Sequence, residues 1–370
     1  MQEIFIKERD RMLGRIVFGH GIGETVPVLE EYAGTASVLN VYVICDIRVS
    51  GYADMLESRA SDSSRVKICG KYMLEASEEK KIMETVLSMT GWLLAGGADR
   101  NALVLAVGGG ITTDMAGFAA SIYKRGVRFA YIPTTLLSQV DAAIGGKTGV
   151  NYDSYKNMLG VIRQPEFTYI CPEVLESLPL RDFLSGAAEM VKTFLIEDGG
   201  WYGKSVRFLS DLHAAVDKQD FLRRNRPALL ELIHAAASVK AGVVSRDQFE
   251  TGERRKLNLG HTFAHAIEKN ARKNGDDITH GEAVSVGIVM AAELSERTGL
   301  APRGFASRLA GELERAGLPV KCPYPVRSLA EAMSRDKKAE DGIIHFVLLS
   351  GPGDVRIADM TISEAARILA

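Results

Sequence analysis

Short apolar runs alternate with an amphipathic stretch through the first half of the chain. Residues 37–46 (SVLNVYVICD), 102–107 (ALVLAV) and 127–133 are rich in β-branched and other apolar side chains, which is typical of buried strands in a parallel sheet. Residues 77–95 begin with a serine and two glutamates, repeat apolar positions at helical spacing, and end at a glycine pair. This pattern predicts an amphipathic helix with an N-terminal cap. The alternation of strands and helices indicates the α/β class.

The pattern changes near Pro172, after which long helical periods dominate. Residues 178–198 and 229–245 are predicted as helices. A chain of 370 residues is too long for one ordinary core. We therefore expect two domains, an α/β domain over residues 1–172 and a mainly α-helical domain over residues 173–370.

Composition excludes some classes of partner. The formal net charge is −2, so no overall positive charge favours nucleic acid or an acidic membrane surface. The four cysteines have no CxxC spacing, which favours buried thiols in a reducing compartment over disulfides or a thiolate zinc site. The N-terminus lacks an apolar signal region, and the apolar run at residues 283–292 is too short to cross a bilayer. We expect a cytoplasmic protein without nucleic-acid or membrane partners.

Glycines and an acidic side chain follow two of the predicted strands. Residues 102–107 lead directly into a triple glycine at residues 108–110, and a helix is predicted from Thr113. Glycines allow a backbone to approach a pyrophosphate, and a helix N-terminus favours its negative charge. Asp46 ends the first strand, where it could accept a hydrogen bond from a ribose hydroxyl. Nucleotide binding is one interpretation; a tight turn is the other, because GGG does not match GxGxxG.

The segment after the third predicted strand carries side chains that can bind anions. It contains Thr134, Thr135, Asp141, a second glycine pair followed directly by Lys147, and Lys156. A lysine held next to two glycines can meet a ligand that the backbone approaches, so phosphate or carboxylate binding is favoured. The alternative is that both lysines are solvated surface charges. GGKT is not a P-loop, because it lacks the upstream glycine.

Three of the chain's seven histidines lie close together in the second half. His261 and His265 share one face of a helix predicted over residues 257–269, and His280 follows a polar break. Arginine and asparagine side chains lie nearby in the sequence. A metal or anion site is one interpretation, and a helix face with satisfied histidines is the other.

Charged side chains also occur in apolar surroundings on the predicted helices. Glu189 and Lys192 are spaced i, i+3, and either pair with each other or face a shared site. Lys240 lies among small and apolar neighbours. A DKK segment precedes a hairpin-like strand at residues 343–349 and could direct a lysine inward.

Taken together, these motifs resemble the 3-dehydroquinate synthase family. The family order is kept by GGGITTDMAGFAASIYKRGVRFAYIPTTLLSQVDAAIGGKTGVN, YKNMLG, SGAAEMVK, LNLGHTFAHAIE, HGEAV and DKK, between residues 39 and 349. The resemblance implies an N-terminal Rossmann-like NAD-binding domain, a mainly α-helical metal- and substrate-binding domain, and a homodimer. It also implies the conversion of the sugar phosphate 3-deoxy-D-arabino-heptulosonate 7-phosphate to 3-dehydroquinate and phosphate in the shikimate pathway.

The same resemblance assigns roles to individual side chains. Zn2+ or Co2+ is expected at Glu189, His261 and His280, so that His265, which helix spacing alone suggested as a ligand, becomes a substrate contact. The other expected substrate-binding or catalytic residues are Arg125, Asp141, Lys147, Asn157, Lys192, Lys240, Arg254, Asn258 and Lys337, with Lys338 as the alternative to Lys337. The expected NAD+ contacts are Asp46, Ala76, Ser77, Glu78, Glu79, Lys80, Lys81, Gly110, Ile111, Thr112, Thr113, Asp114, Thr134, Thr135, Lys147, Lys156, Val174, Leu175, Glu176 and Ser177.

Two departures from the family pattern concern individual cofactor contacts. The family often has DGExxK where this chain has ASEEKK, and a glycine where Thr113 stands. The alternative functions are another sugar-phosphate cyclase, a metal-dependent polyol dehydrogenase and an inactive binding protein. A dehydrogenase would not need the phosphate and carboxylate clamp of Lys147, Lys240, Arg254 and His265, and an inactive copy would be expected to lose a metal ligand or a lysine.

Overall fold

The computed structural model describes residues 1–34, 38–153, 155–334 and 343–370. Contacts divide the chain into two compact units. Unit 1 comprises Met1–Leu178 and Lys240–Phe249, and unit 2 comprises Pro179–Val239 and Glu250–Ala370. The sequence predicted a single domain boundary at residue 172. It did not predict that Lys240–Phe249 belongs to unit 1.

Unit 1 is built on a seven-stranded sheet with the strand order β1-β2-β9-β6-β5-β3-β4. The strands are β1 (Gln2–Glu8), β2 (Arg11–Phe18), β3 (Leu39–Asp46), β4 (Val66–Leu74), β5 (Leu103–Gly108), β6 (Arg128–Pro133) and β9 (Thr168–Ile170). β1 and β2 form an antiparallel hairpin, and the other neighbouring strands are parallel. The carboxyl ends of β6, β5 and β3 therefore lie side by side at one edge of the sheet.

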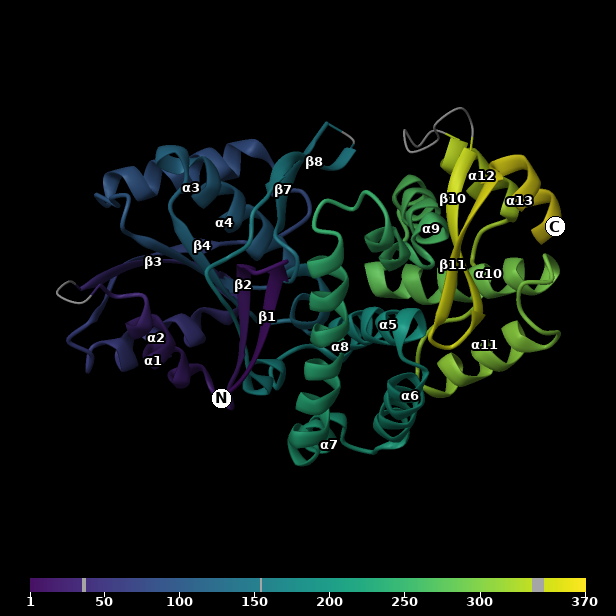
Figure 1. The fold of residues 1–370 in the computed structure, drawn as a ribbon, viewed down its shortest axis with the longest axis horizontal. Helices are drawn as coiled ribbons and strands as arrows, with labels where there is room; N and C mark the ends of the chain where they lie inside the picture. The colour runs from purple at the N-terminus through teal and green to yellow at the C-terminus, as the bar shows by residue number, and fades with distance from the viewer. Residues whose placement is uncertain (35–37, 154, 335–342) are drawn as a thin grey trace. The chain divides into compact units, whose positions relative to one another are not determined.

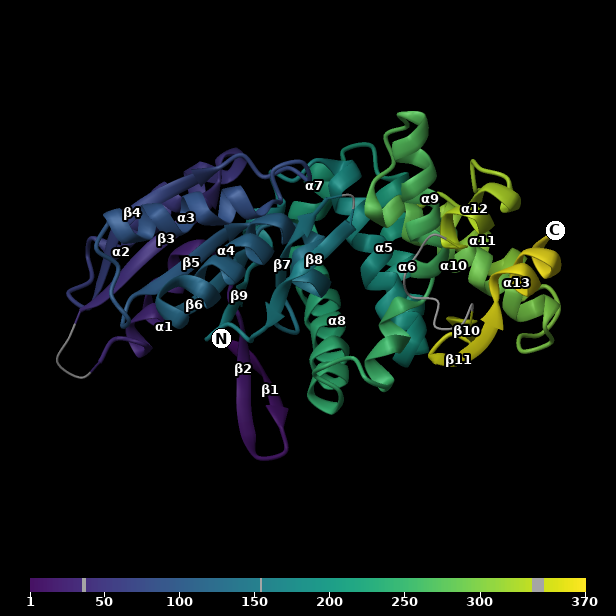
Figure 2. The ribbon, with the colours of Figure 1, turned by 90° about the horizontal axis from the view of Figure 1, so that it is seen from above.

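Helices cover both faces of this sheet (Figure 1). They are α1 (Thr25–Glu31), α2 (Ser50–Ala60), α3 (Met83–Ala95) and α4 (Gly110–Ile122). Figures 1 and 2 show α3 and α4 on one face and α1 and α2 on the other. Val86, Met89 and Leu93 of α3 are buried with Val104 of β5 and Met115 of α4 in one apolar cluster. A separate hairpin is formed by β7 (Lys147–Tyr152) and β8 (Tyr155–Ile162).

Unit 2 is mainly helical. It contains α5 (Leu180–Glu197), α6 (Gly199–Ala214), α7 (Lys218–Arg224), the first part of α8 (Arg226–Arg246), α9 (His261–Asn274), α10 (His280–Arg297), α11 (Phe305–Arg315), α12 (Val326–Ser334) and α13 (Ile362–Leu369), with an antiparallel hairpin of β10 (Ile343–Gly351) and β11 (Asp354–Thr361). α10 packs against α5, α9 and α11 and is buried along most of its length. The predicted α/β class with a helical second half is confirmed, as is the hairpin after the DKK segment.

α8 is long and apolar enough to cross a bilayer, and 56% of its most apolar window is buried inside the structure. A core helix of a folded protein meets the same criteria of length and composition. The helix is therefore weak evidence for a membrane segment.

α3, α4 and α9 are among the helices that begin at residues other than those predicted. α3 begins at Met83 because residues 77–81 form a turn, in which the Lys80 N–H donates to the Ser77 carbonyl oxygen at 3.1 Å. α4 begins at Gly110, since Gly109 is extended and serves as its N-cap. α9 begins at His261, directly after a glycine with a φ of 76°. The sequence periodicity identified each helix, but it started α3 and α9 too early and α4 too late.

Candidate functional site

One carboxylate and two imidazoles form a cluster inside unit 2. Glu189 belongs to α5, His261 is the first residue of α9, and His280 is the first residue of α10. One ligand atom from each lies within 4.8 Å of the other two. His280 Nε2 is 3.3 Å and His261 Nε2 is 3.6 Å from Glu189 Oε1, and the Glu189 side chain is 0% exposed. One oxygen and two nitrogen donors fit Zn2+ and leave coordination positions for other ligands.

Glycines next to the two histidines allow the three helices to approach closely. A Cβ atom added at Gly281 would lie 2.1 Å from the Ser185 carbonyl oxygen, one helical turn before Glu189 on α5. A Cβ atom at Gly287 of α10 would lie 2.2 Å from the Gly260 carbonyl oxygen, directly before His261. Real Cβ atoms do not approach backbone oxygens this closely. The cluster therefore depends on backbone-to-backbone packing of α10 against α5 and against the start of α9.

Hydrogen-bond acceptors on the far side of each imidazole turn its Nε2 toward Glu189. His261 Nδ1 lies 3.2 Å from the Leu259 carbonyl oxygen, and His280 Nδ1 lies 3.1 Å from Glu268 Oε1. An acceptor at Nδ1 favours the tautomer with its proton on Nδ1, which leaves the Nε2 lone pair for a metal. We assign both tautomers from these partners.

Charges around Glu189 keep it ionised despite its burial. Burial raises the pKa of this carboxyl, but Lys192, His261 and His280 lower it by more, so it lies well below its ordinary value. Lys192 Nζ is 2.5 Å from Glu189 Oε2. Burial lowers the pKa of His280, but the neighbouring carboxylates of Glu189 and Glu268 raise it to about 10. Among the described residues, neither Glu189 oxygen accepts a hydrogen bond of ordinary geometry, and a cation would satisfy both.

Other predicted substrate contacts of unit 2 lie on or just before α9. The ring centres of His265 and His261 are 5.6 Å apart, and the metal-binding group found among the described residues does not include His265. Arg254 is 2% exposed. The Asn258 amide donates to Glu250 Oε1 at 2.8 Å. A buried arginine, a buried lysine and a histidine thus accompany the cluster in one unit, as recognition of an anion requires.

The predicted nucleotide-binding residues of unit 1 gather at the carboxyl ends of adjacent strands. Asp46 ends β3, the triple glycine joins β5 to α4, and Thr134 and Thr135 follow β6. Asp46 is 4% exposed, and its Oδ2 lies 2.6 Å from Arg48 Nη2. A Cβ atom at Gly109 would lie 3.0 Å from the Thr135 side chain. This edge of a parallel sheet, beside a helix N-terminus, is where dinucleotides bind in such folds.

Lys81 is held inside unit 1 by two predicted site residues. Its side chain is 6% exposed, and its Nζ donates to Asp114 Oδ2 at 2.6 Å and to Asn157 Oδ1 at 2.5 Å. Burial raises the pKa of Asp114, while Lys81 opposes this increase. Asn157 has a φ of 51°, a backbone conformation that is uncommon outside glycine and frequent at functional sites. The departure from the family pattern in residues 76–81 therefore leaves this lysine directed into the site region.

Asp141 and Lys240 form an ion pair within unit 1. Asp141 belongs to a π-helical turn, Ser138–Ala142, a rare geometry that often occurs at functional sites. Lys240 is 6% exposed. A buried lysine paired with a carboxylate can hold a fixed position until a ligand anion competes for it.

Arg125 lies in an exposed, strained turn after α4. Arg125 has a φ of 66° and the preceding Lys124 a φ of 49°. Two consecutive non-glycine residues in the left-handed region cost free energy. Lys147 and Lys156 are exposed on β7 and β8. Lys337 and Lys338 lie outside the described residues.

Sequence reasoning missed three features of these sites. Glu268 lies seven residues after His261 on α9, so helix geometry alone places it on the same face two turns later. Arg48 lies two residues after Asp46, and the Ala76 carbonyl oxygen accepts from its Nη2 at 2.9 Å. No sequence pattern pointed to the role of Gly281, because its close contact is with Ser185 of α5, far away in the chain.

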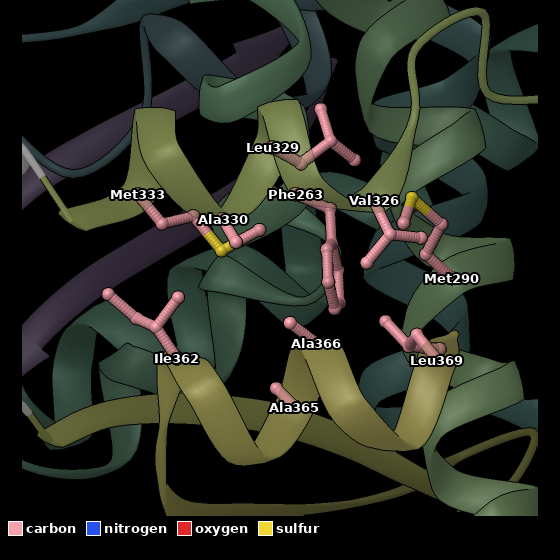
Figure 3. Close-up of a pocket in the computed structure, with 10 residues that line it drawn as sticks. All are labelled: Phe263, Met290, Val326, Leu329, Ala330, Met333, Ile362, Ala365, Ala366 and Leu369. Atoms are coloured by element: carbon pink, nitrogen blue, oxygen red, sulfur yellow. The ribbon is translucent and has the colours of Figure 1, made fainter.

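A small apolar pocket in unit 2 lies apart from this chemistry (Figure 3). It has a volume of about 10 Å³ and is lined by carbon and sulfur atoms of α12, α13, Phe263 and Met290. A space of this size holds about one water molecule, and the lining is mostly apolar. The pocket is a packing defect between helices rather than a ligand site.

Comparisons with known proteins agree on one family. The model of the 3-dehydroquinate synthase N-terminal domain matches residues 71–185, and that of the C-terminal domain matches residues 186–339. The chain is 41% identical to 3-dehydroquinate synthase of Acidithiobacillus ferrooxidans, over 86% of this chain and 84% of that protein. It is 40% identical to 3-dehydroquinate synthase of Legionella pneumophila, over 79% of this chain and 77% of that protein.

Solved structures with the same fold include two synthases that hold NAD+ and a metal. A 2-epi-5-epi-valiolone synthase from Streptomyces hygroscopicus with NAD+ and Zn2+ bound has a TM-score of 0.82 at 30% identity, covering 96% of this chain and 95% of that chain. A 2-deoxy-scyllo-inosose synthase with carbaglucose-6-phosphate, NAD+ and Co2+ has a TM-score of 0.80 at 25% identity, covering 100% and 99%. A probable glycerol dehydrogenase, at 15% identity and a TM-score of 0.57, shows the fold alone. From its two matching family models and its identity with curated relatives, the chain belongs to the 3-dehydroquinate synthase family, which acts in the shikimate pathway.

Proposed function

We propose that the chain is a carbon–oxygen lyase that converts 3-deoxy-D-arabino-heptulosonate 7-phosphate to 3-dehydroquinate and phosphate. The observation that carries the proposal is the Glu189, His261 and His280 cluster, with Lys192 and Arg254 buried in the same unit. The reaction comprises transient oxidation of the C5 hydroxyl, elimination of phosphate, re-reduction, and ring opening followed by aldol closure. The enzyme would act in the cytoplasm as a homodimer.

NAD+ and a divalent metal are the proposed cofactors, with residues 1–172 binding NAD+ and residues 173–370 holding the metal. When bound, NAD+ supplies reversible hydride transfer, and Zn2+ or Co2+ supplies charge that lowers the pKa of the substrate hydroxyl. Glu189, His261 and His280 would hold the metal. Two structural neighbours carry NAD+ with such a metal in their solved structures, which supports the proposal.

The chain's own cations would bind the substrate. The substrate carries a carboxylate and a phosphate, so lysine and arginine side chains must offset several negative charges. The proposed contacts are Lys147, Lys192, Lys240 and Arg254. Burial of Lys192, Arg254 and Lys240 fixes their positions and reduces screening by water.

Arg125 is proposed to reach the phosphate bound by the other subunit of a homodimer. Its strained, exposed turn supports this role, because strain in a turn is kept where the surrounding structure or a partner uses it. An arginine is suited to bidentate phosphate binding.

The experiment that tests the proposed function measures turnover with trace NAD+. Because hydride is taken and returned within one cycle, a small amount of NAD+ should support many turnovers, with no build-up of NADH. Accumulation of NADH in proportion to product would instead identify a polyol dehydrogenase. Failure to release phosphate at any NAD+ concentration would exclude the cyclase reaction.

A further inference from the structure

Glu268 contacts a proposed metal ligand from outside the ligand cluster. It lies on α9, its side chain is 12% exposed, and its Oε1 is 3.1 Å from His280 Nδ1. The opposite nitrogen of the same ring, Nε2, is 3.3 Å from Glu189 Oε1. The His280 ring is therefore held between two carboxylates on opposite sides.

We propose that Glu268 is a positioning residue that fixes the tautomer and orientation of His280 and thereby strengthens metal binding. The proposal rests on the proposed metal site of the preceding section. Glu268 does not belong to the metal-binding group found among the described residues, so it acts through His280. Carboxylates in this position typically raise the metal affinity of a histidine ligand about 10–100-fold.

The two histidine ligands are oriented by different kinds of acceptor. His261 Nδ1 faces the carbonyl oxygen of Leu259, at 3.2 Å, within the turn that leads into α9. His280 is 34% exposed and has a side-chain acceptor instead. The chain itself fixes the Leu259 carbonyl oxygen next to His261. The His261 ring therefore needs no further residue to orient it. The more exposed His280 ring depends on Glu268 to restrict its rotation.

The position of Glu268 also suits the charge of the site. A divalent ion beside Lys192 places three positive charges against the single carboxylate of Glu189. A second carboxylate at the far side of His280 reduces this excess without occupying a coordination position. The Glu268 carboxylate lies close to the metal ligands because α9 carries both His261 and Glu268.

Zinc affinity of the purified full-length chain tests the proposal. Zn2+ would be measured by competition with a chromophoric chelator for the wild type, Glu268→Ala and Glu268→Gln. Glu268→Ala should bind Zn2+ about 10–100-fold more weakly than the wild type. Glu268→Gln keeps an oxygen acceptor and should lie between the two. The matched control is Glu331→Gln on α12, whose carboxylate is 63% exposed and pairs with Arg327; it should keep wild-type affinity.

The outcomes separate this inference from the proposed function. If the wild type does not bind Zn2+, the proposed metal site fails. If the wild type binds Zn2+ and Glu268→Ala binds it within threefold, the positioning role is overturned. Weaker binding by Glu268→Gln than by Glu268→Ala would also contradict it. The absorption spectrum of the Co2+ form gives a second readout, because a reoriented ligand changes the bands in Glu268→Ala. Circular dichroism of the metal-free variants confirms that they are folded.

Discussion

Replacing Gly281 by alanine should displace α10 from α5 and disturb the metal cluster. The added Cβ would lie 2.1 Å from the Ser185 carbonyl oxygen and 2.4 Å from its Cα, so the two helices must separate by about 1 Å to restore van der Waals contact. Neither obstacle is a flexible side chain. Overpacking of this kind costs about 1–3 kcal/mol, and the backbone contact places Gly281→Ala at the upper end.

The same displacement predicts a loss of metal affinity. His280 precedes Gly281 on α10, and Glu189 lies one turn after Ser185 on α5. Metal–ligand distances are tolerated within about 0.2 Å, so a shift of about 1 Å removes one ligand from its place. Zn2+ affinity should fall together with the free energy of unfolding.

Urea unfolding and chelator competition would measure the two effects. Gly203→Ala is the matched control, because Gly203 is exposed within α6 and its Cβ would have no atom within 4 Å. That variant should gain about 0.5–1 kcal/mol, since alanine favours a helix over glycine. The reasoning is refuted if Gly281→Ala unfolds at the wild-type urea midpoint and binds Zn2+ with wild-type affinity.

Three further predictions concern the cofactors and the subunit arrangement. Lys81→Met leaves the partly buried Asp114 carboxylate without its cation and should lower the free energy of unfolding by about 2 kcal/mol and weaken NAD+ binding. Calorimetry would show neither change if the pair is dispensable. Chelator treatment should abolish turnover and Zn2+ or Co2+ should restore it, whereas full activity in protein shown by elemental analysis to be free of metal would reject the metal assignment. Arg125→Ala and His265→Ala chains should each be poorly active alone. If Arg125 acts across the interface, a mixed dimer contains one site with both side chains intact, so the co-refolded mixture should recover about a quarter of wild-type activity. No recovery in proven mixed dimers would place Arg125 in its own chain's site.

Sequence reasoning identified local elements better than contacts between distant ones. The apolar run before Asp46 predicted a strand and the periods in the second half predicted helices, because both patterns reflect burial of neighbouring residues. Helix starts were less accurate. Ser77 resembles a cap, but α3 begins at Met83 since Lys81 turns inward to meet Asp114.

The metal cluster shows the same limit. Spacing on one helix suggested that His261 and His265 act together, whereas the structure groups His261 with His280 and with Glu189 of α5. No periodicity relates Glu189 to His261, because their contact depends on how α5, α9 and α10 pack. Resemblance to the family named the same three residues that the structure groups together, and Glu268 emerged only from the structure.

The most direct test of the account follows two products of one reaction. The protein would be incubated with 3-deoxy-D-arabino-heptulosonate 7-phosphate, NAD+ and Zn2+, and phosphate and 3-dehydroquinate would be measured together. We expect equal amounts of both products from the wild type and neither product from a folded Glu189→Gln variant. Phosphate without 3-dehydroquinate, or undiminished turnover in Glu189→Gln, would contradict it.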